Sequence, residues 1–309
     1  MKYEQWLKDW LENYIKPTAK TKTYSRYRGI IKNQIISHLG SLEIEDLSPI
    51  DVQAFVVNLM KNGNVRNGKG LSTSTINTII TLIQSSLRTA YSLGITTEYK
   101  ADKIKRPKQQ EKKVECFSLK EQKQIEEYIN KRHNTKLNGV ILCLYTGLRL
   151  GELLALEWSD INLKNGEMNI NKSCYDGKDE NGVFRRITDT PKTKTSIRVI
   201  PIPKQILPML KEMKKKSKTE LVIFGRGKNF RVRSYQRSFY CMLKNIGLQK
   251  RGFHSLRHTF ATRALECGMD VKTLAEILGH KNPTVTLNRY AHSLMEHKKE
   301  MMNKLGKLL

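Results

Sequence analysis

Residues 252–263 read GFHSLRHTFATR, and they place two histidines and two arginines at the start of a helix with one apolar face. That face is formed by Phe253, Leu256, Phe260 and Ala264. Arg257 lies at its border, one turn after His254, so the two side chains can reach the same point. A half-buried guanidinium is costly unless an anion pairs with it. The partner is either a glutamate of the protein, the simpler choice for this arginine alone, or a phosphate.

A second cationic position lies in YTGLRLGELLALEW, residues 145–158. Gly147 breaks one helix, so Arg149 falls in the first turn of a helix over about 148–157, where free backbone N–H groups also attract an anion. Glu152, one turn later, can orient Arg149 by a hydrogen bond. The alternative is a surface ion pair worth about 0.3 kcal/mol, although the flanking leucines argue against an exposed position.

Two further stretches carry groups that could move protons or act as nucleophiles. In TPKTKTSIRVIPIP, residues 190–203, a lysine-rich turn precedes a strand; we favour Lys192, which follows the proline, over Lys194. A lysine beside a leaving oxygen is a sensible general acid, whereas most lysines in turns are only solvated. In LGHKNPTVTLNRYAHS, residues 278–293, His280 follows a helix end and Tyr290 lies ten residues later. Taken alone, the imidazole could simply cap carbonyls and the phenol could simply pack.

The composition favours a polyanionic partner. The chain has 309 residues, with 56 Lys+Arg against 29 Asp+Glu, which gives a net charge of +27 and a pI of about 9.9. A chain this basic makes most sense beside nucleic acid, with an anionic membrane surface as the second choice. No segment supports the membrane, because the longest apolar run, 139–148, is too short to span it. The N-terminus also lacks the apolar segment of a signal peptide.

Disulfide and metal chemistry are not expected. The five cysteines are scattered and form no CxxC pair, which is typical of single reduced thiols. His254 and His258 have the spacing of a zinc pair, but no acidic residue lies between them and no third ligand is apparent. We therefore expect no metal site.

Apolar periodicity predicts a mainly α-helical protein with a small antiparallel β-sheet, in two domains. The first, 1–101, is expected to hold four helices, one opened by Pro49 and a long one capped by Ser72. Residues 102–115 are dense in lysine and lack apolar periodicity, which is typical of a linker. In so basic a chain, this linker is expected either to be solvated or to lie against phosphates.

The second domain is expected over 116–309, and it is mixed α/β. Its first helix is predicted to begin with a capping box of Ser118 and Glu121. Alternating apolar residues predict strands at 167–173 and 197–203, separated by a polar, glycine-containing insertion. Helices are expected from about 204 to the end.

In this order, the motifs TGLRLGEL, a lysine in a β-turn, HSLRHTFATR, LGH and TLNRYAH resemble the tyrosine recombinase (phage integrase) family. The resemblance covers about 115–295, and it is weaker over 1–100, where the helical module is similar to the family's core-binding domain. PKTKTSIRVIPIP with its long preceding insertion is most similar to integrases of conjugative transposons and of phages of Gram-positive bacteria. The implied fold is a helical core-binding domain that clamps DNA, joined to a catalytic domain of the DNA breaking-rejoining type.

The resemblance also implies which residues bind the phosphate. Arg149 and Arg257 would hold the non-bridging oxygens of the scissile phosphodiester and stabilise the charge that builds up in the transition state. His254 and His280 would hydrogen-bond to the same phosphate, and His254 is the better candidate to help deprotonate the nucleophile. Glu152 would support Arg149 rather than react.

The same resemblance assigns the two groups that exchange bonds and protons. Tyr290 would attack phosphorus to form a 3′-phosphotyrosine, and Lys192 would protonate the departing 5′ oxygen. A 5′-hydroxyl of a second strand would then reverse the step. Because the phosphotyrosine stores the bond energy, no nucleotide cofactor is implied, and the cationic side chains replace divalent metal ions.

The implied partner is double-stranded DNA with specific recombination sites, bound by a tetramer, and a further accessory protein could set the direction of the reaction. In the tail, 292–309, Leu294, Met301 and Leu308 are seven apart, which predicts an amphipathic helix. This helix is expected to dock either on its own domain or on a neighbouring protomer.

The expected function is therefore site-specific DNA recombination, with integration or excision of a mobile element or phage as the role. The protein is expected in the bacterial cytoplasm, associated with the nucleoid. The N-terminal arm-binding domain of many phage integrases is not apparent. Two alternatives remain open at this stage: a type IB topoisomerase with the same chemistry, and a non-enzymatic DNA-binding protein whose basic faces only hold phosphates.

Overall fold

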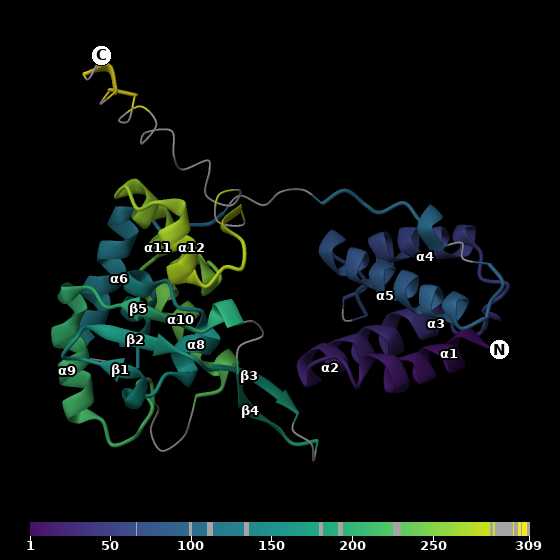
Figure 1. The fold of residues 1–309 in the computed structure, drawn as a ribbon, viewed down its shortest axis with the longest axis horizontal. Coiled ribbons are helices and arrows are strands. Elements are labelled where there is room, and N and C mark those ends of the chain that lie inside the picture. The colour runs from purple at the N-terminus through teal and green to yellow at the C-terminus, as the bar shows by residue number, and fades with distance from the viewer. Residues whose placement is uncertain are drawn as a thin grey trace. The chain divides into compact units, whose positions relative to one another are not determined.

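The computed structural model describes most of the chain, namely residues 1–65, 67–98, 101–109, 114–132, 136–178, 182–190, 194–224, 230–284, 287, 299, 302–303 and 305–307. The chain divides into two compact units, Met1–Lys112 (unit 1) and Lys113–Leu309 (unit 2), so the division falls inside the predicted linker. Helices predominate and the strands are few, short and antiparallel, which confirms the predicted fold class (Figure 1). No helix among the described residues is both long and apolar enough to span a bilayer.

The described residues of unit 1 form four α-helical segments, as predicted, and one short 3-10 turn. Their elements are α1 (Tyr3–Trp10) with the π-helical turn η1 (Leu11–Ile15), α2 (Thr21–Ile30) with η2 (Ile31–Ile35) and α3 (Ile36–Leu39), α4 (Pro49–Asn62), α5 (Thr73–Ser92), and a short 3-10 turn, η3 (Ala101–Lys103). Pro49 opens α4, and the Ser72 hydroxyl caps α5 by accepting from the backbone N–H of Thr75 at 3.3 Å. Both predicted helix starts are therefore confirmed.

The core of unit 1 joins α1 to α5 through buried aromatic side chains that also use their polar atoms. The Tyr3 hydroxyl lies 2.8 Å from Ser86 Oγ, and Trp6 Nε1 donates to Ser86 O at 3.1 Å. Trp10 Nε1 donates to Thr89 Oγ1 at 3.2 Å. Pairing these polar atoms removes the cost of burying them, so the rings contribute their full apolar area to the core.

The first residues of the predicted linker lie on unit 1. Ile104 is buried in its core, and Lys105 N donates to Gln53 Oε1 at 3.0 Å. Arg106 Nη1 donates to Asn77 O and Thr81 Oγ1, both at 3.2 Å. This part of the basic segment is therefore held along α5.

Unit 2 begins with helices, continues with short strands and returns to helices. Its elements are α6 (Leu119–Arg132), α7 (Asn138–Thr146), α8 (Leu150–Ala155), η4 (Trp158–Asp160), β1 (Ile161–Asn162), β2 (Glu167–Ile170), β3 (Ser173–Lys178), β4 (Phe184–Asp189), η5 (Lys194–Ser196), β5 (Arg198–Pro201), η6 (Lys204–Ile206), α9 (Leu207–Lys216), α10 (Val232–Asn245), α11 (His254–Glu266) and α12 (Val271–Leu278). The predicted capping box is present, since Ser118 N donates to Glu121 Oε2 at 2.8 Å and Glu121 N to Ser118 Oγ at 3.2 Å.

In the part of unit 2 that the structure describes, the strands form two separate sheets. β2 pairs with β1 on one side and with β5 on the other, and Met168 lies opposite both Ile161 and Ile200. β2 and β5 are the two strands that the sequence predicts. The polar insertion between them is not irregular, because it forms the antiparallel hairpin β3–β4, which the apolar pattern did not predict.

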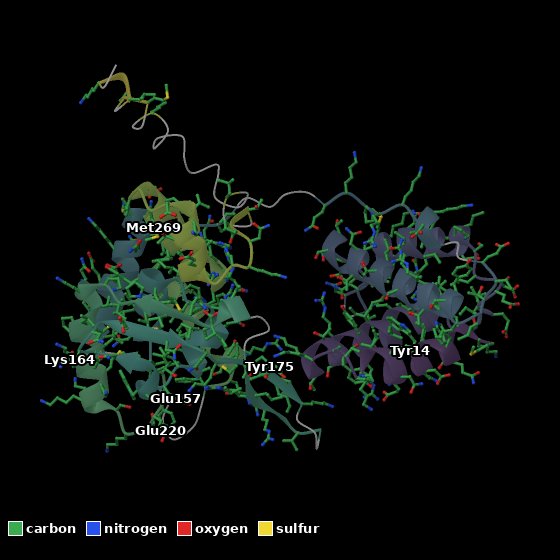
Figure 2. All side chains as sticks on the ribbon, in the orientation of Figure 1. Tyr14, Glu157, Lys164, Tyr175, Glu220 and Met269 are labelled. Carbon is green, nitrogen blue, oxygen red and sulfur yellow. The ribbon has the colours of Figure 1, made fainter. Side chains whose placement is uncertain are left out.

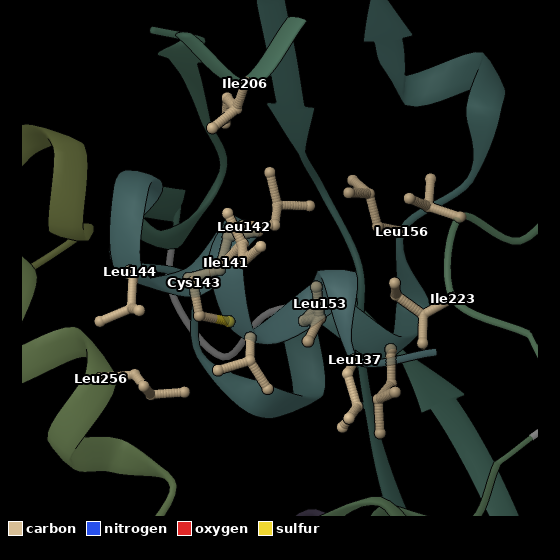
Figure 3. Close-up of a cluster of buried hydrophobic side chains, with 14 of the residues drawn as sticks. Leu137, Ile141, Leu142, Cys143, Leu144, Leu153, Leu156, Ile206, Ile223 and Leu256 are labelled. Carbon is tan, nitrogen blue, oxygen red and sulfur yellow. The ribbon is translucent and has the colours of Figure 1, made fainter. Parts of the chain in front are cut away.

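The core of unit 2 is built around α7, which is buried on nearly all sides. Leu142 and Leu144 of this helix pack among side chains from α8 and α11, such as Leu153 and Leu256 (Figure 3). Burying each such leucine stabilises the fold by roughly 1.5–3 kcal/mol. Charged side chains project from the outer surfaces of both units (Figure 2). Because α7 is fixed so firmly, the turn that follows it gives the candidate site a rigid base.

Candidate catalytic site

The turn between α7 and α8 is pressed against α11 and α12. Gly147 ends α7 with φ +66°, a left-handed conformation that favours glycine. A Cβ at this position would lie 2.5 Å from Phe260 Cδ1 and 2.8 Å from Leu278 Cδ2, so a side chain has no room. Only glycine allows this turn, and the turn places Arg149 beside the end of α12.

Arg149 is the N-cap of α8, one residue before the first turn in which we expected it. The helix is also shorter than the predicted 148–157, since it covers only Leu150–Ala155. The backbone N–H of Arg149 is not available to an external anion, because it donates to Glu152 Oε2 at 2.9 Å. The Arg149 side chain is about one-third exposed, so it is the part of Arg149 that can meet a ligand.

Glu152 is the buried acceptor at the centre of the site, with only 4% of its surface exposed. Its carboxylate accepts from Arg149 Nη1 at 2.7 Å, which confirms the predicted hydrogen bond and rules out a pair on the surface. It also accepts from Arg198 Nη1 at 3.2 Å and from Arg198 Nη2 at 3.0 Å. Two guanidinium groups therefore share one carboxylate.

The electrostatics of Glu152 depend on these two arginines. Burial acts to raise the pKa of the Glu152 carboxyl, but the hydrogen bonds and charge of Arg198, helped by Arg149, outweigh it. The net effect is a pKa below the ordinary value of 4.5. Glu152 is thus ionised at neutral pH, and it holds both arginines in place as a fixed negative charge.

Three successive carbonyl oxygens at the C-terminal end of α12 accept hydrogen bonds from three different arginines. The pairs are Arg198 Nε with Ile277 O at 2.5 Å, Arg257 Nη2 with Leu278 O at 2.5 Å, and Arg149 Nη2 with Gly279 O at 3.3 Å. The last carbonyls of a helix have no partner within the helix, and they carry the negative end of its dipole. The helix end therefore gathers three cationic side chains at one place, from the N-cap of α8, from β5 and from α11.

Arg257 is buried more deeply than the sequence suggests, since only 1% of it is exposed. Besides Leu278 O, its guanidinium donates to Gly147 O at 2.9 Å, and its Nη2 lies 3.0 Å from His280 Nε2. We expected a glutamate or a phosphate as the partner of this charge. In the structure, backbone carbonyls of the α7–α8 turn and of the α12 end accept hydrogen bonds from this guanidinium.

His280 follows Gly279, which has φ +64° and lies against the Arg198 side chain, where a Cβ would come within 3.0 Å of Nη1. A guanidinium can only donate, so in the contact with Arg257 the Nε2 atom of His280 is the acceptor. The imidazole then carries its proton on Nδ1. The structure thus brings together Arg149, Arg257 and His280, three of the residues predicted from the sequence.

Of the other predicted residues, the structure describes His254. His254 is the first residue of α11 and is exposed, and its ring packs edge-on against His258 with centroids 4.5 Å apart. Lys192 and Tyr290 lie outside the described residues. Among the residues that the structure describes, no group of His, Cys, Asp and Glu is arranged to hold a metal ion.

Arg198 is the residue that the sequence analysis missed. It is 9% exposed and contacts Glu152, Ile277 O and Ser196 O. The sequence does contain a sign of this role. Alternate residues of a strand face the same side, so Arg198 should face inward together with the buried Ile200 and Ile202. An arginine on the inner face of a strand requires a buried acceptor.

The low pKa of Glu152 predicts a pH-dependent effect of Glu152→Gln. A depressed pKa contributes stability above the unfolded value, and this stability is lost as the pH falls through the folded value. At pH 7 we expect the substitution to lower the free energy of unfolding by about 3 kcal/mol, because it leaves the buried Arg198 and the partly buried Arg149 with a neutral partner. The difference from the unmodified protein should shrink below pH 4.5.

Denaturant unfolding of both proteins between pH 7 and pH 3 measures this difference. Glu4→Gln is the control and should cost little at any of these pH values, because Glu4 pairs with the exposed Lys8 on the surface of α1. A Glu152→Gln penalty that is independent of pH would contradict the assignment of the charge.

Comparisons with known proteins cover both units. Residues 116–297 match the Phage integrase family, and residues 2–60 match the family described as Phage integrase, N-terminal SAM-like domain. A curated relative, Tyrosine recombinase XerC-like from Caldanaerobacter subterraneus subsp. tengcongensis, is 30% identical over 97% of this chain and 81% of its own length.

Two solved structures share the fold. The Tn1549 transposon integrase in complex with transposon right end DNA matches with a TM-score of 0.82 and 21% identity, over 99% of this chain and 100% of that chain. A lambda integrase tetramer bound to a Holliday junction matches with a TM-score of 0.68 and 21% identity, over 92% and 79% of the two chains. The family match spans more than half of the sequence, and with the XerC-like relative it shows that this chain belongs to the phage integrase family of tyrosine recombinases.

Proposed function

We propose that this recombinase cleaves and rejoins DNA at specific sites through a 3′-phosphotyrosine, and that its role is the integration or excision of a mobile element. The observation that carries the proposal is the convergence of Arg149, Arg257 and His280 at the end of α12. Arginines held by a buried carboxylate and by carbonyls cannot rearrange easily, so they are preorganised to receive charge. The net charge of +27 supports DNA as the ligand.

In this proposal, the Tyr290 hydroxyl attacks phosphorus and the bond from phosphorus to the 5′ oxygen breaks. The phenolic proton leaves with the help of His254, and the 5′ oxygen receives a proton from Lys192. Arg149 and Arg257 stabilise the extra negative charge on the non-bridging oxygens, and His280 donates its Nδ1–H to the phosphate. A 5′-hydroxyl of a second strand then attacks the phosphotyrosine, which restores Tyr290 and completes the exchange.

The partner is double-stranded DNA bound by a tetramer of this chain. A lambda integrase of the same fold is a tetramer on a Holliday junction, and the Tn1549 integrase is bound to transposon DNA. We propose that residues 292–309, whose pattern predicts an amphipathic helix, dock on a neighbouring protomer. An accessory protein would then set the direction of recombination, and the protein would act on the bacterial nucleoid.

Tyr290→Phe removes the nucleophilic oxygen and should abolish any covalent protein–DNA adduct, while DNA binding is retained. The probe is a pool of DNA duplexes with randomised sequence, each carrying a nick. After cleavage the short fragment next to the nick diffuses away, so the strands cannot be rejoined and the adduct is trapped. Peptide mapping should find the phosphate on Tyr290, and sequencing of the trapped junctions gives the target site. Tyr240→Phe, on α10, is the control and should form the adduct normally. An adduct on another residue would overturn the proposed nucleophile.

Lys192→Ala should slow cleavage of the trapped sequence by at least about 100-fold, because it removes the general acid. Replacing the 5′ oxygen by sulfur should restore the rate, since a thiolate departs without a proton. Single-turnover cleavage of both substrates measures this, with Lys194→Ala as the matched control that cleaves both normally. If Lys194→Ala shows the loss and the rescue, then Lys194 is the acid instead.

Deleting residues 295–309 should prevent assembly of the tetramer on DNA, because the deletion removes most of the apolar stripe. Sedimentation of protein–DNA complexes should show complexes smaller than a tetramer at concentrations where the full chain forms one. Replacing Lys299 and Lys304 by alanine removes charge from the same segment but keeps the stripe, and should leave assembly intact. Unchanged tetramers after the deletion would show that the tail does not join protomers.

A further inference from the structure

We propose that Asp176 and Arg186, which face each other across the hairpin β3–β4, are positioning residues that lock α8 and so set the placement of Arg149 and Glu152. The proposal rests on the proposed function of strand cleavage through Arg149. The role of these two residues is to hold the C-terminal end of α8, whereas the arginine cluster at the end of α12 holds the N-terminal end.

Arg186 holds the C-terminal end of α8. Its Nη2 donates to Leu154 O, a carbonyl in the last turn of that helix. The N-terminal end of α8 is held by Glu152 through Arg149 and Arg198. A helix of only six residues has little stability of its own, so its orientation depends on the packing of its buried Leu153 and Leu154 and on the polar contacts at its two ends.

Asp176 holds a second helix from the opposite strand. Its Oδ1 accepts from Val232 N at 3.1 Å, and its Oδ2 accepts from Arg233 N at 3.0 Å. These are the first two N–H groups of α10, which have no partner within the helix, so the carboxylate caps α10 and meets the positive end of its dipole. The cross-strand pair thus connects the C-terminal end of α8 to the N-terminal end of α10.

The backbones of α8 and β3 also approach closely. A Cβ on Gly151 would lie 2.5 Å from Ser173 Oγ and 2.6 Å from Cys174 O, so the first residues of β3 lie directly on α8. Figure 2 shows Tyr175 at this root of the hairpin. A movement of the hairpin root is therefore passed to α8, which carries Glu152.

Arg186→Met tests the proposal, because methionine keeps much of the length of the side chain and removes the hydrogen bond to Leu154 O. We expect the single-turnover cleavage rate at saturating DNA to fall roughly 10- to 100-fold, because displacing catalytic groups from their reactive geometry slows the chemical step. The DNA affinity and the fraction of protein molecules able to cleave should change less than about twofold. A protein that is only destabilised loses part of this fraction, but its remaining folded molecules cleave at the normal rate. Arg186→Lys keeps a donor and should recover part of the rate.

Arg185→Met is the matched control. It removes the same charge from the adjacent residue of β4, which is exposed and points to the other face of the hairpin. We expect this variant to cleave saturating DNA at the unmodified rate. Equal rate losses in the two variants would overturn the proposal, because the loss would then come from charge on the hairpin.

Amide hydrogen exchange in the protein without DNA gives a readout that does not depend on activity. In Arg186→Met, the amides of 150–155 should exchange faster relative to those of β2, and in Arg185→Met they should not. Unchanged exchange, or faster exchange with an unchanged cleavage rate, would overturn the positioning role. If the unmodified protein forms no phosphotyrosine adduct, the proposed function fails, and the exchange result alone then decides whether the lock on α8 exists.

Discussion

The candidate site depends on the C-terminal end of α12, where three consecutive carbonyls each bind a different arginine. Carbonyl dipoles carry no full charge, so they hold guanidinium groups without neutralising them. A set of carboxylates would have held the arginines equally well, but it would repel a phosphate. The helix end thus holds the arginines inside the protein without cancelling the positive charge that attracts an anion.

The local parts of this arrangement could be predicted from the sequence. Gly147, Arg149 and Glu152 lie within six residues, so helix geometry alone predicts the break, the cation and its support. The helix starts at Ser72 and Ser118 follow from capping chemistry in the same way. In each of these cases the interacting groups lie within one turn of the chain.

The remaining parts depend on contacts between distant segments. Arg198 reaches Glu152 across 46 positions, and Arg257 reaches Gly147 across 110, so no local pattern shows that they meet. The hairpin β3–β4 escaped prediction for another reason: most of its side chains are exposed or only half-buried, and apolar alternation is absent. Its two caps on neighbouring helices are polar contacts, which periodicity does not reveal.

The Glu152 carboxylate accepts four hydrogen bonds, and this affects how the cleavage rate should depend on pH. Arginine does not titrate in the range where proteins are folded, and the Glu152 carboxyl stays ionised down to acidic conditions. In the proposed mechanism, the arginines and Glu152 around the phosphate would therefore keep the same charge from mildly acidic to basic solution. If the proposed mechanism holds, the limbs of a bell-shaped rate profile would therefore report on the proposed imidazole, ammonium and phenol groups rather than on the arginines or Glu152.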